Sequence, residues 1–193
     1  MSECKCEKSV HVTCIIDRSG SMESMKNDAI GGFNAFLEEQ KALPGKMHLT
    51  VILFDHDFAV AFDGDLKDAK PLDHKTFIPR GNTALLDAIG RGINLTEVDV
   101  RKSKVDKVAV VILTDGEENA SKEFNQDVIR KMIEHQQRCE SWEFFFLAAN
   151  QDAFTVGSSI GVKGVNSITY EASGAGVRGA YSNITNSVKN IRS

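Results

Sequence analysis

The chain has 193 residues, of which 41% are hydrophobic and 26% are charged, and both values are close to the average for globular domains. This length predicts one domain whose core is large enough to be stable without disulfides. The formal net charge of -4 argues against nucleic-acid binding, which normally depends on clustered Lys and Arg. No segment approaches the roughly 20 apolar residues of a membrane span, and residues 1–9 lack an apolar signal core. We therefore expect a cytoplasmic protein without nucleic-acid or membrane partners.

Residues 1–9 are polar and predict a flexible tail, which is followed by a single domain over residues 10–193. Cys4 and Cys6 lie in this tail and are the only closely spaced cysteines. A zinc site needs about four ligands, and no other Cys or His pair stands at a useful spacing for them. We interpret the two thiols as reduced and solvated. Cys14 lies within an apolar run and is expected to be buried.

The first half of the domain predicts two buried strands, a helix between them and an edge strand. Residues 10–16 and 49–54 are apolar runs typical of strands that are buried on both faces. Between them, residues at helical spacing predict a helix that ends before Pro44-Gly45: Ile30, Phe33 and Leu37. Gly31 and Gly32 each cost about 1 kcal/mol in a helix relative to alanine, which suggests a close approach of this helix to the sheet. Alternating apolar residues over 58–62 predict an antiparallel edge strand.

The second half alternates helices with strands. Leu86, Ile89 and Ile93 predict a helix before the apolar strand 108–113. Another helix is expected around residues 128–133, followed by strands at 144–147 and 167–170. Apolar residues then recur at helical spacing and predict a closing helix: Val177, Tyr181, Ile184, Val188 and Ile191. The alternation predicts an α/β fold, a doubly wound and mostly parallel sheet of about six strands with one antiparallel edge strand and helices on both faces.

Oxygen-bearing side chains stand at the predicted ends of these elements. Asp17, Ser19 and Ser21 follow the first strand, Thr83 precedes a helix, and Asp115 follows the strand 108–113. Parallel strands deliver their carboxyl ends to one crevice, so these loops are expected to meet. Hydroxyl and carboxylate oxygens suit a hard cation such as Mg²⁺, whereas His and Cys would favour zinc. The pattern therefore indicates a divalent-cation site.

This constellation resembles that of the von Willebrand factor type A domain family, whose metal-ion-dependent adhesion site has the pattern Asp-x-Ser-x-Ser followed by a distant Thr and a later Asp. The matching segments here are Asp17-Arg18-Ser19-Gly20-Ser21, Gly81-Asn82-Thr83 and Thr114-Asp115-Gly116, and the order of strands and helices is similar over residues 10–192. Asn82 stands where the family often has Gly. The resemblance implies a Rossmann-like fold and metal-dependent protein binding.

By this resemblance Ser19, Ser21 and Thr83 would supply hydroxyl oxygens to Mg²⁺, with Mn²⁺ and Ca²⁺ as alternatives. Asp17 and Asp115 would bind the ion directly or through water, and an Asp or Glu of a partner protein would occupy the open position. Relatives inside cells often act beside an ATPase or in multiprotein assemblies. Glu117 and Glu118 are interpreted as a solvated loop.

Two other functions remain open. The first is a Mg²⁺-dependent phosphoester hydrolase. Phosphatases of the haloacid dehalogenase type also have an Asp at the end of the first strand, but the chain resembles them less, because the Asp that they have two residues later is Ser19 here. A structural assembly component with a vestigial metal site is the other alternative. The sequence contains no phosphate-binding Gly-x-x-x-x-Gly-Lys loop and no His-Glu-x-x-His, so a non-enzymatic function is favoured. The scattered histidines, including His11 and His48 on predicted strands, are interpreted as packing or solvent-exposed residues.

Overall fold

The structure is a computed structural model that describes residues 9–149 and 152–192. Six strands form one sheet in the order β3-β2-β1-β4-β5-β6. Their bounds are Val10–Asp17 for β1, Met47–Phe54 for β2, Phe58–Asp65 for β3, Lys107–Thr114 for β4, Glu143–Ala149 for β5 and Ser167–Tyr170 for β6. β3 pairs antiparallel with β2 at the edge, whereas the other neighbouring strands are parallel. The predicted fold class is therefore confirmed.

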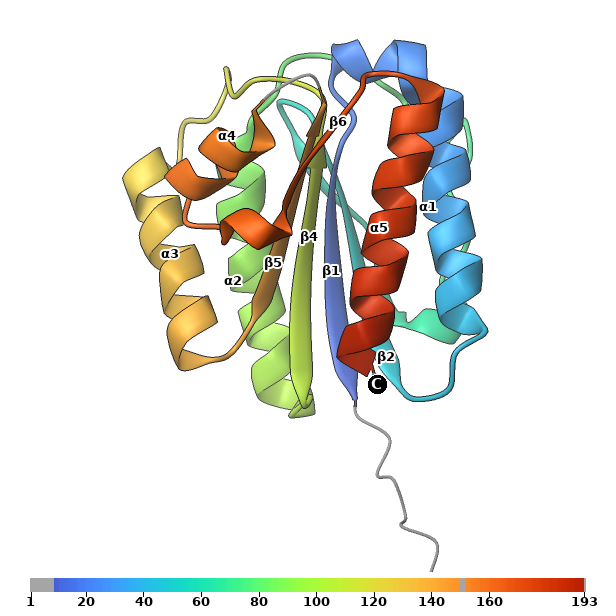
Figure 1. The fold of residues 1–193 in the computed structure, drawn as a ribbon, viewed down its shortest axis with the longest axis vertical. Helices are drawn as coiled ribbons and strands as arrows, with labels where there is room; N and C mark the ends of the chain where they lie inside the picture. The colour runs from blue at the N-terminus through green and yellow to red at the C-terminus, as the bar shows by residue number, and fades with distance from the viewer. Residues whose placement is uncertain (1–8, 150–151, 193) are drawn as a thin grey trace, which may run out of the picture.

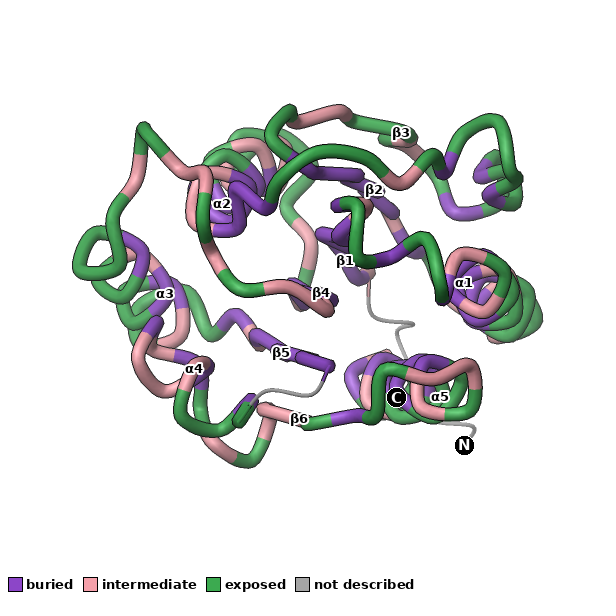
Figure 2. Tube along the Cα trace, turned by 90° about the horizontal axis from the view of Figure 1, so that it is seen from above, coloured by how far each residue is buried: buried purple, intermediate pink, exposed green. Residues whose placement is uncertain are grey.

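Helices cover both faces of the sheet (Figures 1 and 2). α1 and α5 lie side by side on one face, and α2, α3 and α4 lie on the other. Their bounds are Lys26–Lys41 for α1, Leu85–Ser103 for α2, Gln126–Cys139 for α3, Ala153–Ser159 for α4 and Gly174–Arg192 for α5. Short 3₁₀ helices span Gly20–Met25 (η1), Leu66–Asp68 (η2) and Gly164–Asn166 (η3). The sequence analysis did not predict α4 or these 3₁₀ helices.

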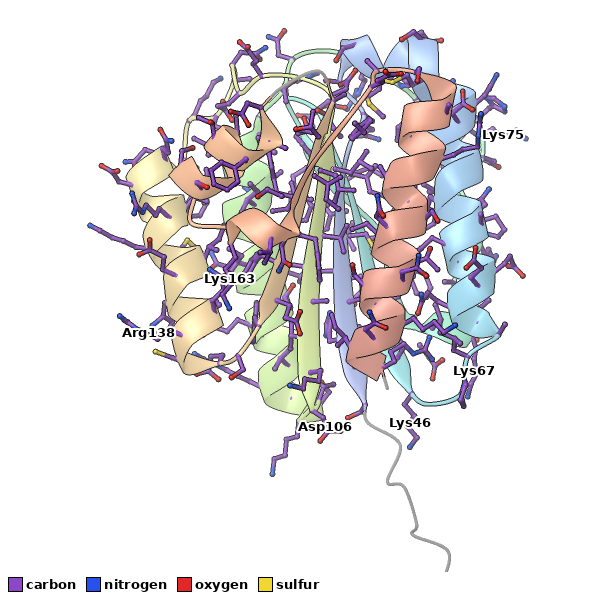
Figure 3. All side chains as sticks on the ribbon, in the orientation of Figure 1. Lys46, Lys67, Lys75, Asp106, Arg138 and Lys163 are labelled. Carbon is purple, nitrogen blue, oxygen red and sulfur yellow. The ribbon has the colours of Figure 1, made fainter. Side chains whose placement is uncertain are left out.

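The alternation of side chains along each strand divides the core into two layers. In β1, Val12, Cys14 and Ile16 pack beneath α1 and α5, whereas Ile15 packs with α2 and α3. All eight residues of β1 are buried, because a central parallel strand has helices on both sides. Figure 3 shows the apolar side chains filling the space between the sheet and the helices. Cys14 is buried, as predicted.

The predicted tail lies almost entirely outside the described residues, including Cys4 and Cys6. Ser9 is described, and its backbone N–H donates to Asp106 Oδ2 at 2.8 Å. This bond fixes the chain just before β1 to the residue that precedes β4. Within residues 9–149 and 152–192, no helix combines the length and the apolar character needed to cross a bilayer.

Gly31 and Gly32 occupy different environments, although they are adjacent in α1. A β-carbon on Gly32 would lie 2.3 Å from Cδ2 of Tyr181, whereas one on Gly31 would have no atom within 4 Å. The predicted close approach of this helix is therefore found at Gly32 but not at Gly31. It brings α1 against α5, so the prediction that it would be against the sheet was wrong. The Tyr181 ring cannot easily turn aside, because it is buried and packs edge-on against Phe33.

Alanine substitutions at these two glycines are expected to have opposite effects on stability. Gly31→Ala should raise the free energy of unfolding by up to about 1 kcal/mol, because alanine favours the helix and the added methyl group meets nothing. Gly32→Ala should lower it by about 1–3 kcal/mol, because overlap with Tyr181 outweighs the gain in helix propensity. Urea unfolding followed by circular dichroism measures both values, and changes of the same sign would contradict the packing described here.

Candidate metal centre

The carboxyl ends of β1 and β4 meet at the centre of the sheet, at the end where the loops form the top of Figure 1. β1 continues into η1 and α1 on one face, and β4 leads towards α3 on the other. The connections therefore diverge between these two strands, which is the position in the topology where open α/β sheets commonly bind ligands. Asp17 is the last residue of β1, and Asp115 directly follows β4.

Asp17 is fully buried at the end of β1. Its Oδ1 accepts the backbone N–H of Ser19 at 2.6 Å, and its Oδ2 accepts the hydroxyl of Thr114 at 2.6 Å. Burial raises the pKa of Asp17 to about 6, although both hydrogen bonds act in the opposite direction. A carboxylate at this position therefore lacks compensating positive charge.

Ser19, Ser21 and Asp115 form a continuous line of oxygens above Asp17. The two serine Oγ atoms are 3.1 Å apart, and Ser21 donates its hydroxyl hydrogen to Asp115 Oδ1 at 2.7 Å. Because Ser21 has only one such hydrogen, Ser19 is the donor in the bond between the serines. Ser19 is buried and Ser21 is exposed, so the line runs from the interior to the surface.

Thr83 joins the same group from the loop before α2. A β-carbon built on Gly116 would lie 2.9 Å from Thr83 Oγ1 and 3.6 Å from the Oγ atoms of both Ser19 and Ser21. One point beside Gly116 is thus surrounded by the three predicted hydroxyl oxygens. The structure therefore brings together all five predicted site residues, Asp17, Ser19, Ser21, Thr83 and Asp115, from three separate segments.

The chemistry and spacing of these oxygens fit a hard dication. Neighbouring ligands in an octahedral Mg²⁺ site at about 2.1 Å are separated by about 3 Å. The separations of 3.1 Å between the serine oxygens and 2.7 Å between Ser21 and Asp115 are close to that value. All five side chains offer oxygen and none offers nitrogen or sulfur, which favours Mg²⁺, Mn²⁺ or Ca²⁺ over zinc.

The Thr83 loop is held against the other two loops by main-chain contacts. The Gly20 N–H donates to the carbonyl of Gly81 at 3.2 Å, and Asn119 accepts the N–H of Thr83 on its side-chain oxygen at 2.9 Å. Gly81 has a φ of +65°, a left-handed conformation that favours glycine. Asn82 follows this turn, and Thr83 after it still lies beside the hydroxyls of Ser19 and Ser21.

The segment after Asp115 has a structural function that the sequence analysis missed. Glu118 was interpreted as part of a solvated loop, but its Oε2 accepts the N–H of Leu86 at 2.9 Å and so caps the start of α2. In return, Asp87 in the first turn of α2 accepts three N–H groups of residues 122–124. These hydrogen bonds hold the pKa of Asp87 below its ordinary value, although desolvation opposes them. The segment and the helix therefore stabilise each other.

A buried ion-pair cluster beside the site was also missed. Asp55 is fully buried at the end of β2, and its Oδ2 accepts the Nε–H groups of Arg18 and Arg80, each at 2.9 Å. The carbonyl of Asp55 accepts the N–H of Ala84 at 2.8 Å. Asp55 thus joins the residue after Asp17 to both ends of the Thr83 loop. Its position directly after a buried strand was the available signal.

Comparisons with known proteins identify the fold. No protein-family model and no curated protein matches the chain. Among solved structures, the ArnB paralog VWA2 from Sulfolobus acidocaldarius has a TM-score of 0.62 at 18% identity, with 91% of this chain and 44% of that protein covered. The von Willebrand factor domain of the type V pilus tip protein Mfa5 from Porphyromonas gingivalis has a TM-score of 0.65 at 10% identity, with 97% of both chains covered.

The chain has the von Willebrand factor type A fold. The pilus adhesin SpaC from Lactobacillus rhamnosus GG contains the same fold, with a TM-score of 0.68 at 13% identity over 94% of this chain and 30% of that protein. The chain spans less than half the length of the archaeal VWA2 protein and of the adhesin SpaC. At these identities the likeness establishes the fold, while the function has to be argued from the residues of the candidate site.

Proposed function

We propose that this von Willebrand type A domain is a divalent-metal-dependent protein-binding module. In this proposal Ser19, Ser21 and Thr83 bind Mg²⁺ through their hydroxyl oxygens, and Asp17 and Asp115 bind it directly or through water. The observation that carries the proposal is the convergence of three hydroxyl oxygens from distant segments on one point beside Gly116. Caps and turns alone would not require Thr83 to lie there.

The position left open on the ion is proposed to accept an Asp or Glu of a partner protein. Hydroxyl ligands carry no charge, so an incoming carboxylate completes both the coordination and the charge of the ion. Ser21 is exposed and Asp115 is half-buried, so this side of the site is accessible from solvent. By thermodynamic linkage, the partner and the ion each tighten the binding of the other.

Protein binding is preferred over hydrolysis by a serine nucleophile, because among the described residues no imidazole base is hydrogen-bonded to Ser19 or Ser21. Ser19 and Ser21 donate their hydroxyl hydrogens along the line to Asp115, and no histidine belongs to this group of side chains. A partner in a multiprotein assembly, including one containing an ATPase, and a cytoplasmic location stay predictions from the sequence. Turnover of generic phosphate esters above the background of an Asp17 variant would favour the hydrolase instead.

Asp17→Asn is expected to abolish the stabilisation of the domain by Mg²⁺ without harming the fold. The amide oxygen can still accept the N–H of Ser19, and the amide group faces the hydroxyl of Thr114. Without metal, the variant should be at least as stable as the wild type at pH 7. The raised pKa of Asp17 means that the ionised carboxylate disfavours folding above about pH 6, and asparagine removes this cost.

Thermal unfolding over a series of MgCl₂ concentrations tests this prediction. At an ion concentration of 100 Kd the wild type should gain about 2.7 kcal/mol, while Asp17→Asn should gain nothing. Glu39→Gln, which removes an exposed carboxylate from α1, is the matched control and should respond as the wild type does. A flat response of the wild type up to millimolar Mg²⁺ or Mn²⁺ would support the vestigial site.

Affinity capture tests the binding step separately. Proteins retained by the immobilised wild-type domain in Mg²⁺ should be released by a chelator and should not be retained by Asp17→Asn. Replacing the partner's acidic contact residue by its amide should then weaken binding in Mg²⁺. Equal recovery with Mg²⁺ and with chelator, and also with the variant, would count against metal-dependent binding.

A further inference from the structure

A second group of metal-ligating side chains lies at the opposite end of the sheet. His48 of β2, Asp63 of β3 and Asp99 of α2 each offer one ligand atom within 4.8 Å of those of the other two. Lys46 and Asp106, both labelled in Figure 3, mark the end of the molecule where β2 and β4 begin, and His48 is two residues beyond Lys46. This cluster therefore shares no residue and no loop with the hydroxyl site.

A chain of hydrogen bonds orients these ligands from behind. His48 Nε2 is 2.6 Å from Asp63 Oδ1, and the same oxygen accepts the hydroxyl of Thr50 at 3.0 Å. His11 Nε2 lies 3.0 Å from Thr50 Oγ1. Because the single hydroxyl hydrogen of Thr50 goes to the carboxylate, His11 must donate from Nε2. The Nδ1 atom of a neutral His11 consequently carries an unshared lone pair.

Two buried acceptors in this region lack a donor. Among the described residues, neither His11 Nδ1 nor Asp99 Oδ2 has a hydrogen-bond partner. His11 is fully buried, and its ring centroid lies 4.5 Å from that of His48. The other carboxylate oxygen of Asp99, Oδ1, lies 3.9 Å from Nζ of the exposed Lys102. The cluster thus contains one buried acceptor atom, Asp99 Oδ2, that receives no hydrogen bond from a described residue.

We propose that His48, Asp63 and Asp99 bind a transition-metal dication of the Zn²⁺ class, with Thr50 and His11 as positioning residues. Imidazole nitrogen and carboxylate oxygen are common zinc ligands, and three protein ligands leave a fourth position for water. Metal ligands in proteins are usually oriented by hydrogen bonds from residues behind them. Here Thr50 donates to the Asp63 carboxylate, and His11 in turn is hydrogen-bonded to Thr50. Asp63 is exposed, so an ion can reach the site from solvent.

The other cluster of this type in the described residues does not offer the same opportunity. Asp55, His56 and Asp57 also bring three ligand atoms together. The Asp55 carboxylate, however, is already paired with the guanidinium groups of Arg18 and Arg80. A cation there would have to displace two guanidinium groups, whereas the ion pair of Asp99 at the His48 cluster is with the single, exposed Lys102 at 3.9 Å.

The test is a Zn²⁺ titration of the full chain in saturating Mg²⁺, followed by calorimetry and thermal unfolding. Cys4 and Cys6 are first replaced by serine, because thiolates bind zinc. We expect one Zn²⁺ per chain and a rise in the melting temperature. His48→Gln and Asp99→Asn should both lose this response, whereas His135→Gln, an exposed histidine of α3, should retain it. Thr50→Val should bind one Zn²⁺ about 10–100-fold more weakly.

Three outcomes would overturn the proposal. The first is no Zn²⁺ binding by the wild type, which would assign the unpartnered acceptors to ordinary hydration. The second is an unchanged response in both His48→Gln and Asp99→Asn. The third is a response that Asp17→Asn loses and His48→Gln keeps, which would place Zn²⁺ in the hydroxyl site. If a variant fails to fold, the ¹⁵N shifts of the His48 ring in the wild type provide the readout, because metal ligation at Nε2 must move them.

Discussion

Gly116→Ala is expected to abolish the response of the domain to Mg²⁺, although it removes no oxygen ligand. The new methyl group would lie 2.9 Å from Thr83 Oγ1 and 3.6 Å from both serine oxygens, and so would occupy the space that the hydroxyls surround. Thr83 is 3% exposed and cannot move aside easily. The backbone itself tolerates alanine, because the positive-φ glycines of the described chain are Gly45, Gly81 and Gly161.

The measurement is the change in melting temperature with MgCl₂. At 100 Kd of the wild type, the expected difference between wild type and Gly116→Ala is about 2.7 kcal/mol of stabilisation. Gly179→Ala is the matched control, because a β-carbon at that position has no neighbour within 4 Å. If the melting temperature of Gly116→Ala rises over the same range of MgCl₂ concentrations as that of the wild type, the ion does not bind among these hydroxyls.

Asp55→Asn is expected to destabilise the domain by about 3 kcal/mol, which corresponds to a fall of about 6–12 °C in melting temperature. The substitution leaves the guanidinium of Arg18, whose side chain is 13% exposed, without its carboxylate partner. Arg80 contributes little to this value, because its side chain is 49% exposed and solvent screens the pair. The affinity for Mg²⁺ should fall as well, since Asp55 connects the loops that carry Asp17 and Thr83.

Asp57→Asn provides the control for this effect. Asp57 belongs to the same turn and pairs with the same Arg80 at 2.8 Å, but its side chain is 58% exposed. Its loss should change the free energy of unfolding by at most about 1 kcal/mol. Similar losses of stability in both variants would show that burial of the Asp55 carboxylate is not the decisive factor.

The architecture was largely predictable because burial leaves a direct record in the sequence. Strands β1, β2 and β4 are covered on both faces and therefore appear as continuous apolar runs. The five apolar positions predicted for the closing helix, from Val177 to Ile191, are all buried in α5. α4 was missed because it has only seven residues and two of them buried, too few for a periodic pattern.

The oxygen-bearing residues of the candidate site were predictable from the sequence, but the hydrogen bonds that hold its loops together were not. Asp17, Ser19 and Ser21 stand together after a strand, so their shared location follows from the local sequence. Thr83 donates its N–H to Asn119, and Leu86 donates its N–H to Glu118, so both bonds join residues that are more than 30 positions apart. Polar residues in loops are usually solvated, and only the packing of β1 beside β4 brings these ones against backbone N–H groups.

The place of the first strand in the sheet has a consequence for the order of folding. β1 lies between β2 and β4, and its apolar face is covered in part by α5, the last described helix. Gln40 of α1 donates to the carbonyl of Thr185 across 145 residues of sequence. Such distant pairings are slow to form, because a long stretch of chain must be closed first. We therefore expect the layer between the sheet and α1 to be completed late in folding, when α5 packs against it.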